Sequence, residues 1–351
     1  MYLSIIGSPG CGKTTLFRAL SGQTGASGAS GSSVAVIDVP DERVDKLSRI
    51  FNPRKTVYGR IEVCDMASIR EGDMKKETIP AKQLQQMRLS DAFLVVLNHF
   101  DDTSVASPAA NFHTMLNEFI ISDMIQIESR LERIRKQSEK KGGTALEQEK
   151  DDLEQCLAHL EQGSPLSSLS LVREDGKALR GFQFLSQKPL MVVVNCSERT
   201  MARADAVTDE VSARVSPMVP VVAACAGLEA ELVMMEPEDR TLFMEEYGLS
   251  ESLRDRLIRL AYETLGLISF LTVGEDECRA WPIRRGTCAQ EAAGVIHTDL
   301  SERFIRAEAV AYDAFMCHGD FSVCKKAGVW RLEGKQYIVQ DGDILSIRAG
   351  V

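Results

Sequence analysis

The segment Gly7–Thr14, which reads Gly-Ser-Pro-Gly-Cys-Gly-Lys-Thr, constrains the fold of this 351-residue chain more than any other feature. It fits the P-loop pattern, and it lies between an apolar strand candidate, Tyr2–Ile6, and a helical run that begins near Thr14. Glycines let backbone N–H groups surround a phosphate, the helix N-terminus adds positive potential, and Lys13 reaches the terminal phosphates. The Thr14 hydroxyl is then available to Mg²⁺. This context argues against a chance match in a glycine-rich turn, so the segment predicts a nucleoside-phosphate site.

The composition narrows the class of protein. Hydrophobic residues make up 44% and charged residues 26% of the chain, as in ordinary globular proteins, and the length allows two or three domains. No signal-peptide pattern is visible, and apolar stretches such as Leu190–Val194 are strand-sized, so we expect a cytoplasmic protein without membrane association. The nine cysteines include no CxxC pair, which indicates neither a zinc site nor a disulfide framework. A net charge of −10 argues against nucleic-acid affinity over the whole surface.

Short apolar segments predict an α/β fold with a doubly wound, mostly parallel sheet. They alternate poorly between apolar and polar residues, which is typical of strands buried on both faces. In such a sheet the ligand lies beyond the C-terminal ends of the strands, and the P-loop follows such an end. The strand candidates are Tyr2–Ile6, Val34–Val39, Val57–Cys64, Ala92–Asn98, Leu190–Asn195 and Met218–Ala224.

A polar, helix-favouring segment interrupts this sheet between about residues 111 and 185. Gly142-Gly143 divides it into two arms, which we expect to pack as an antiparallel coiled coil. The basic residues near its tip indicate either a solvated helix face or a contact for RNA or the ribosome. The apolar positions are Ile121, Ile125, Ile127, Leu131 and Ile134 on one arm and Leu146, Leu153, Leu157 and Leu160 on the other. The basic residues are Arg130, Arg133, Arg135, Lys136, Lys140 and Lys141, accompanied by Glu132 and Glu139.

The chain changes character again near Ile268, where a mixed α+β module of roughly eighty residues begins. Its elements are a hairpin of Ile268–Val273 and Arg279–Ile283, a helix at Ala289–Val295, and strand candidates Tyr337–Val339 and Ile344–Ile347 around the turn Gln340–Asp343. The predicted domains are a P-loop domain of residues 1–110 and 186–267, an inserted helical domain of residues 111–185, and a C-terminal domain of residues 268–351.

Asp65 predicts the second anchor of a magnesium ion. It ends the apolar run Ile61–Cys64, about fifty residues beyond the P-loop, where P-loop proteins place an Asp that holds Mg²⁺, usually through water. A strand-end Asp alone is a weak signal. Combined with Lys13 and Thr14, it predicts a site for a magnesium–nucleotide complex.

The segment Asn195–Glu198 bears on the choice of base. Guanine-specific P-loop proteins carry an Asn-Lys-x-Asp motif whose Asp accepts two hydrogen bonds from guanine, but this segment reads Asn-Cys-Ser-Glu. A misplaced carboxylate would leave buried polar groups of guanine unpaired, which costs free energy, whereas adenine lacks that donor pair. We therefore expect ATP rather than GTP. GTP specificity through Glu198, or an incidental loop after the strand, are the alternatives.

On these residues the chain resembles the Obg-like ATPase (YchF) family. Its members are P-loop NTPases of the translation-factor class with an inserted coiled coil and a C-terminal TGS domain. The resemblance covers nearly the full length. Its most specific segments are residues 39–47, 195–198, 279–287, 293–299, 330–335 and 340–343.

The resemblance implies binding of Mg·ATP with low intrinsic hydrolysis, a ubiquitin-like TGS domain that contacts RNA or a ligand, and the ribosome as partner. In bacterial members it also implies stress and redox regulation. Ile69 matches a hydrophobic residue that stands where a GTPase has its water-positioning Gln, so we assign Lys13 and Ile69 to hydrolysis. The residues expected around the phosphates are Gly7, Pro9, Gly10, Cys11, Gly12, Lys13, Thr14 and Thr15. Those expected around the base are Phe100, for which a core position is the alternative, Asn195, Cys196, Glu198, Cys225 and Ala226, and the metal ligands are Thr14 and Asp65.

The chain departs from the family pattern in four places. Gly10 replaces an Asn tied to potassium-assisted hydrolysis, Ser68 replaces a Gly whose amide senses the γ-phosphate, and Gly227 replaces a Lys. The first switch, residues 21–33, has only Thr24 as a candidate for the Thr that completes the magnesium shell. These departures leave phosphate binding intact, but they raise the alternative of a nucleotide-gated binding module with vestigial hydrolysis. A redox role for Cys11 is a further alternative, because a helix N-terminus lowers a thiol pKa.

Overall fold

The structure is a computed structural model that describes residues 1–22, 33–100, 106–138, 144–170, 179, 181–246 and 251–350. The chain divides into two compact units, one of Met1–Ala35 and Glu62–Arg254 and the other of Val36–Ile61 and Asp255–Val351. This grouping differs from the predicted domains, because residues 36–61 and 255–267 belong with the C-terminal residues. None of the described helices combines the length and the apolar character that crossing a bilayer requires.

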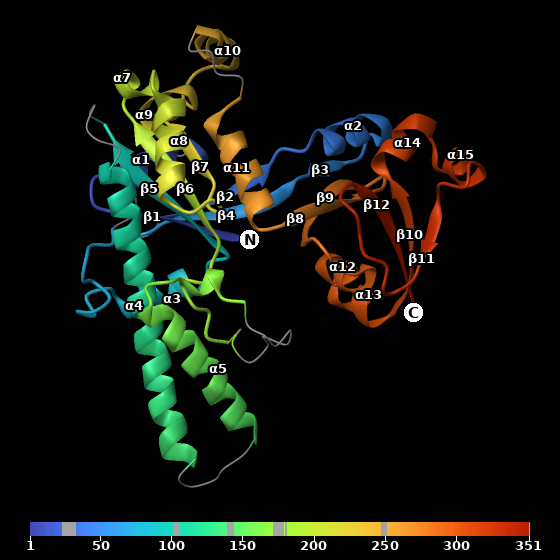
Figure 1. Cartoon of the computed structure of the whole chain (residues 1–351). Helices are drawn as coiled ribbons and strands as arrows, with labels where there is room; N and C mark the ends of the chain where they lie inside the picture. The colour runs from blue at the N-terminus through green and yellow to red at the C-terminus, as the bar shows by residue number, and fades with distance from the viewer. Residues whose placement is uncertain are drawn as a thin grey trace. The chain divides into compact units, whose positions relative to one another are not determined.

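The first sheet has six strands in the order β2-β4-β1-β5-β6-β7 (Figure 1). β1 pairs in parallel with β4 and β5, and parallel pairing continues through β6 to β7. β5 and β6 are buried along nearly their whole length, as expected of strands covered on both faces. The predicted fold class is therefore confirmed. The strands are β1 (Tyr2–Gly7), β2 (Ser33–Val39), β4 (Gly59–Asp65), β5 (Ala92–His99), β6 (Leu190–Cys196) and β7 (Val221–Ala224).

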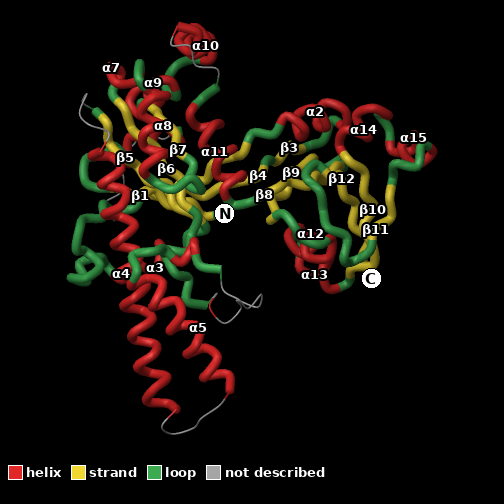
Figure 2. Tube along the Cα trace, in the orientation of Figure 1, coloured by secondary structure: helices red, strands yellow, loops and turns green. Residues whose placement is uncertain are grey.

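Helices of the first unit lie against this sheet (Figure 2), and their apolar side chains pack on it. On one face, Val95 of β5 and Val192 of β6 lie in a buried cluster with Met87 of α3, Phe119 of α4 and Val211 of α8. α1 packs against α9. The helices are α1 (Lys13–Ser21), α3 (Ala81–Leu89), α4 (Ala106–Ser138), α5 (Thr144–Glu161), the 3₁₀ turn η1 (Leu166–Ser168), α7 (Glu198–Met201), α8 (Ala204–Arg214), α9 (Ala226–Leu232) and α10 (Pro237–Glu246).

α4 and α5 form the antiparallel arm that the apolar spacing predicted (Figure 1). Ile127 and Ile134 of α4 are buried against Leu153 and Leu160 of α5. α4 begins at Ala106, earlier than predicted, because its first turns belong to the sheet cluster through Phe112, Met115 and Phe119. Two predicted seam positions are wrong: Ile121 packs on the sheet cluster, and Ile125 is 39% exposed and lines an open cavity of about 550 Å³. Gly142-Gly143, Glu139, Lys140 and Lys141 lie outside the described residues.

The second unit contains a mixed sheet in the order β11-β10-β12-β8-β9-β3. β8 and β9 form the predicted antiparallel hairpin, β12 pairs in parallel with β8, and α12 packs on the sheet, as a ubiquitin-like α+β domain requires. The strands are β3 (Lys55–Val57), β8 (Leu267–Val273), β9 (Glu277–Arg284), β10 (Phe304–Ala311), β11 (Arg331–Glu333) and β12 (Asp343–Ala349). The helices are α2 (Glu42–Phe51), α11 (Leu253–Thr264), α12 (Ala289–Ile296), α13 (Thr298–Glu302), α14 (Tyr312–His318) and α15 (Phe321–Lys326).

Three predicted strands differ from those observed. The candidate Val57–Cys64 is divided at Tyr58, because residues 55–57 pair in parallel with β9 of the C-terminal sheet. The candidate that began at Met218 begins at Val221 instead; Met218 is 86% exposed, and Pro220 has no N–H for a ladder hydrogen bond. Residues 337–339 make only an isolated bridge, between Ile338 and Cys288.

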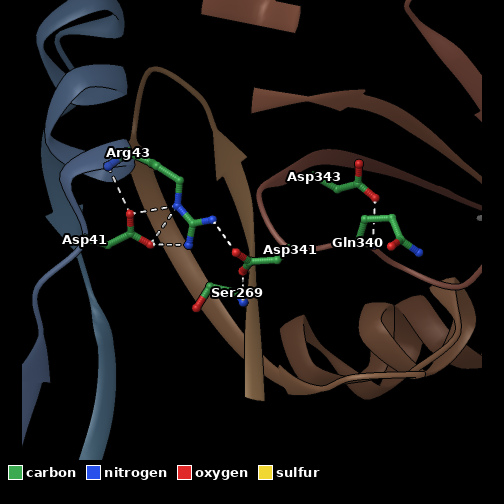
Figure 3. A network of polar contacts seen from close by, with 6 residues as sticks. All are labelled: Asp41, Arg43, Ser269, Gln340, Asp341 and Asp343. Carbon is green, nitrogen blue, oxygen red and sulfur yellow. Dashed lines mark hydrogen bonds and ion pairs between the residues drawn. The ribbon is translucent and has the colours of Figure 1, made fainter. Parts of the chain in front are cut away.

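A polar network attaches α2 to the C-terminal sheet (Figure 3). The Arg43 guanidinium donates to both carboxylate oxygens of Asp41, the N-cap of α2, and through Nη1 to Asp341 Oδ2 at 2.8 Å. Asp341 Oδ1 accepts from the Ser269 N–H of β8 at 2.9 Å. Beneath the network, Val44 and Leu47 of α2 are buried in a cluster with residues of β8, β9 and α14. Residues 39–47 and 340–343 are two of the most family-specific segments. They therefore contact each other through Arg43 and Asp341.

Candidate functional site

The C-terminal ends of five neighbouring strands meet at one edge of the first sheet. Register pairs Ile5 of β1 with Asp65 of β4, and Asn195 of β6 with Asn98 of β5 and Ala224 of β7. The loops that follow these strands carry the P-loop, Phe100, residues 196–198 and residues 225–226. The structure thus brings the predicted phosphate, metal and base residues to one edge, where open α/β sheets bind ligands.

The P-loop presents an uncapped helix N-terminus. α1 begins at Lys13 after Gly12, without a side-chain cap and without an acidic residue in its first turn. Its first N–H groups are therefore suited to an anion. Gly7 is required by close packing, because a Cβ there would lie 2.6 Å from Cys11 Sγ and 2.7 Å from the Val96 carbonyl oxygen. Cys11 is fully buried and its burial raises the pKa of its thiol, which argues against the redox alternative and for a wall position.

Lys13 holds its ammonium group inside the site. The side chain is only 6% exposed, and Nζ donates to the carbonyl oxygens of Gly7 and Ser8, each at 3.2 Å. A third hydrogen bond, of 2.8 Å, goes to Ser68 Oγ. The three donors of the ammonium thus each have an acceptor.

Thr14 and Asp65, the predicted metal ligands, contact each other. Thr14 Oγ1 donates to Asp65 Oδ2 at 2.8 Å. Asp65 is 7% exposed, and within the described part of the chain its Oδ1 is buried without a hydrogen-bond partner. Burial raises the pKa of Asp65, while the Thr14 hydrogen bond and the charges of Lys13 and Arg18 act in the opposite direction. Such an orphaned carboxylate oxygen is suited to a cation.

Asn195, near the end of β6, connects the P-loop to the start of α9. Its side chain is buried; Nδ2 donates to the Cys11 carbonyl oxygen and Oδ1 accepts from the Ala226 N–H, each at 3.0 Å. It therefore fixes the P-loop relative to the loop after β7. These bonds give Asn195 a positioning role beside the base contact that the sequence predicts.

We expect Gly12→Ala to disrupt this bridge. Gly12 has φ 92°, and an added Cβ would lie 2.1 Å from Asn195 Nδ2. The displaced amide would lose its hydrogen bonds, so nucleotide affinity should fall by roughly tenfold or more. Titration calorimetry measures the nucleotide affinity, and thermal melting measures the stability of the variant. Gly22→Ala is the matched control, since Gly22 has φ 68° at the end of α1 but only an ordinary contact with Val233; equal affinity losses in the two variants would contradict the argument.

The remaining predicted residues divide between the rim and the interior. Phe100 is 38% exposed, and its Cζ would lie 3.7 Å from a Cβ on Gly12, so the alternative of a core Phe is wrong. Glu198 is exposed in the first turn of α7, which Ser197 caps. Pro9 and Gly10 are exposed at the tip of the P-loop, and Thr15 is half-buried in α1. The buried members of the set are Cys196, Cys225 and Ala226.

Ile69 is held next to the P-loop by a backbone hydrogen bond, and its side chain is apolar. Its N–H donates to the Gly7 carbonyl oxygen at 3.2 Å, and its side chain is 4% exposed within the apolar cluster of the sheet. The Ile69 side chain has no group that can orient water by hydrogen bonding. Thr24 and most of the first switch lie outside the described residues.

Glu118 is a residue that the sequence reasoning missed. It is 2% exposed on α4, and its two carboxylate oxygens accept from the N–H groups of Gly72 and Met74 at 2.7 and 2.8 Å. The segment that follows Asp65 and Ser68 is thereby attached to α4. The sequence signal that could have identified Glu118 is its place as a charged residue within the apolar stretch of Phe112, Met115 and Phe119.

A P-loop after the central strand, a buried lysine and a Thr–Asp pair define a P-loop nucleotide-binding protein. A family model described as 50S ribosome-binding GTPase matches residues 2–142, and the YchF GTPase C-terminal model, described as a protein of unknown function, matches residues 267–350. The ribosome-binding ATPase YchF of Bacillus subtilis is 36% identical, covering 99% of this chain and 98% of its own, and that of Escherichia coli O157:H7 is 33% identical, covering 97% of each. The YchF GTPase structure from Schizosaccharomyces pombe superposes with a TM-score of 0.83 at 26% identity, covering 99% of this chain and 97% of its own. The chain belongs to the YchF family.

Proposed function

We propose that this chain is a cytoplasmic, magnesium-dependent ATPase of slow turnover that acts as a ribosome-linked regulator. The observation that carries the proposal is the Thr14–Asp65 pair beside the buried ammonium of Lys13. Lys13 stabilises negative charge on the β- and γ-phosphates, and the N–H groups at the start of α1 bind the phosphate oxygens.

The residues present fit a magnesium ion. Asp65 Oδ1 is buried without a partner in the described residues, and the Thr14 hydroxyl lies at its other oxygen. Thr14 would bind the metal directly and Asp65 through water. When bound, the ion neutralises charge that develops on the phosphates.

Slow turnover follows from the residues near the γ-phosphate position. Ile69 offers no polar group to a water molecule, so catalysis rests on Lys13 and the metal alone. The same observation supports the second candidate, a nucleotide-gated binding module in which hydrolysis is vestigial.

The base preference rests on Asn195–Glu198. Asn195 is held between the P-loop and Ala226, and Glu198 is exposed in a capped helical turn. We propose ATP, the nucleotide named for the bacterial relatives, whereas the yeast relative is named a GTPase. GTP hydrolysis is therefore the alternative function for the same site.

Calorimetric titration of ATP and GTP with Mg²⁺, followed by single-turnover hydrolysis, tests the proposal. ATP binding with measurable turnover is the expected result. ATP binding without turnover would favour the binding module, and a preference for GTP would overturn the assignment of residues 195–198.

The arm and the C-terminal TGS domain are the proposed contacts with the ribosome or RNA. Both bacterial relatives are named ribosome-binding. On the arm, Arg130 is bound to Glu149 through two hydrogen bonds of 2.7 Å, and Lys136 pairs with Glu132. Arg133 is exposed. The basic surface available to RNA is thus smaller than the composition suggests.

Replacing Arg133, Arg135 and Lys136 together by Glu should weaken co-sedimentation with ribosomes by about tenfold or more, because favourable phosphate contacts become repulsive. The loss should shrink as salt concentration rises. The matched control reverses Lys75, Lys76 and Lys82 of the first unit, which are exposed outside the arm and change the net charge equally. Equal binding by both triple variants would identify the arm as a solvated helix face.

A further inference from the structure

Ser68 is a departure from the family pattern whose side chain contacts the P-loop lysine. Its Oγ accepts a 2.8 Å hydrogen bond from Lys13 Nζ, the group that meets the terminal phosphates in P-loop proteins. A Gly at this position would offer no side chain to Lys13. The contact is therefore a property of this chain's own residue.

The backbone around Ser68 holds the hydroxyl in place. The Met66 N–H donates to the Ile5 carbonyl oxygen at 3.1 Å, and the Ile69 N–H donates to that of Gly7 at 3.2 Å. Gln83 Nε2 donates to the Ala67 carbonyl oxygen at 3.2 Å. Ser68 thus lies on a segment attached to β1 on both sides of it, so its position relative to the P-loop is set before a nucleotide arrives.

The arrangement leaves the hydroxyl proton of Ser68 available as a donor. The Lys13 ammonium already has three acceptors, so a phosphate oxygen must take the place of one of them. Two of the three are carbonyl oxygens of the P-loop backbone, whereas Ser68 Oγ is a side-chain atom that can rotate. As an acceptor from Lys13, the hydroxyl keeps its own proton for donation. A phosphate oxygen that took the place of Ser68 Oγ on Lys13 would lie beside this hydroxyl.

We propose that the Ser68 hydroxyl donates a hydrogen bond to the terminal phosphate of a bound nucleoside triphosphate and makes the site discriminate triphosphate from diphosphate. This inference rests on the proposed function, since it requires that Lys13 bind the terminal phosphates. The hydroxyl adds a side-chain donor at a position where a Gly would offer only its backbone N–H. Its partner changes from Lys13 to the phosphate when the nucleotide binds.

Titration calorimetry with Mg·ATP and Mg·ADP on the full chain tests this role in wild type, Ser68→Ala and Ser68→Thr. Loss of a hydrogen bond to a charged group should lower the ATP affinity of Ser68→Ala roughly tenfold to a hundredfold. ADP affinity should stay within about threefold, a change of less than 1 kcal/mol. Ser68→Thr, which keeps the hydroxyl, should restore the preference for ATP.

Two results would overturn the inference while leaving the proposed function intact. An unchanged ATP-to-ADP affinity ratio in Ser68→Ala would show that the hydroxyl does not donate a hydrogen bond to the terminal phosphate. A rise in both affinities would show that Ser68 only competes with phosphate for Lys13. Failure of the wild type to bind any nucleoside triphosphate would instead overturn the proposed function itself. Melting curves confirm that each variant is folded.

Discussion

Replacing Lys13 by Ala is expected to lower nucleoside-triphosphate affinity at least about a hundredfold, since the charge that meets the terminal phosphates is removed. In the free protein the side chain is 6% exposed and makes three hydrogen bonds inside the site. The variant also leaves Asp65 without the nearest positive charge. Calorimetric titration with Mg·ATP measures the loss directly.

The matched control is Lys188→Ala. Lys188 is a half-buried lysine of the first unit, and its Nζ donates to the Ser90 carbonyl oxygen rather than to the P-loop. It should change stability without changing nucleotide affinity. Wild-type affinity in Lys13→Ala would refute the assignment of the whole phosphate site.

Replacing Glu118 by Ala is expected to release the segment that follows Asp65. The N–H groups of Gly72 and Met74 would lose the buried carboxylate that accepts their hydrogen bonds, at about 1–3 kcal/mol for each unpaired group. The local opening free energy of residues 70–78 should fall by roughly 2–5 kcal/mol. Hydrogen exchange followed by peptide mass spectrometry measures it, and the peptide that covers β5 provides the internal reference.

Glu128→Ala on the same helix is the control, since Glu128 is exposed and should alter exchange at residues 70–78 by no more than a few tenths of a kcal/mol. Glu118→Gln should have an intermediate effect, because the amide retains one acceptor oxygen. Unchanged exchange in Glu118→Ala would mean that other contacts hold the segment.

The sequence signals for the proposed nucleotide site are local. A glycine-rich loop between a strand and a helix, and an Asp that ends a strand, each follow from a short stretch of chain, as do the hairpin of β8 and β9 and the seam positions Ile127 and Leu153. Ser68 could be recognised as unusual from its position alone. Its contact with Lys13 could not, because that contact depends on how two loops approach each other.

What the sequence did not predict depends on distant partners. β10 was missed because Arg306 and Glu308 interrupt its apolar pattern, and Glu308 is accommodated only by Arg348 of the neighbouring β12. β3 was merged with β4 because nothing local separates a strand that pairs with β9 from one that pairs with β1. Ile125 follows the spacing of a seam residue, yet it faces a cavity.

The attachment of α2 to the C-terminal sheet has a consequence for the nascent chain. Arg43 and its partner Asp341 are 298 residues apart, so at ordinary synthesis rates α2 emerges about 15–60 s before that partner exists. During this interval the apolar face formed by Val44 and Leu47 lacks its partners in β8 and β9. The sheet of the second unit can therefore be completed only after β12 has been synthesised, and a fragment that starts at residue 267 would lack both α2 and β3. Such a fragment exposes the edge of β9 and is expected to aggregate.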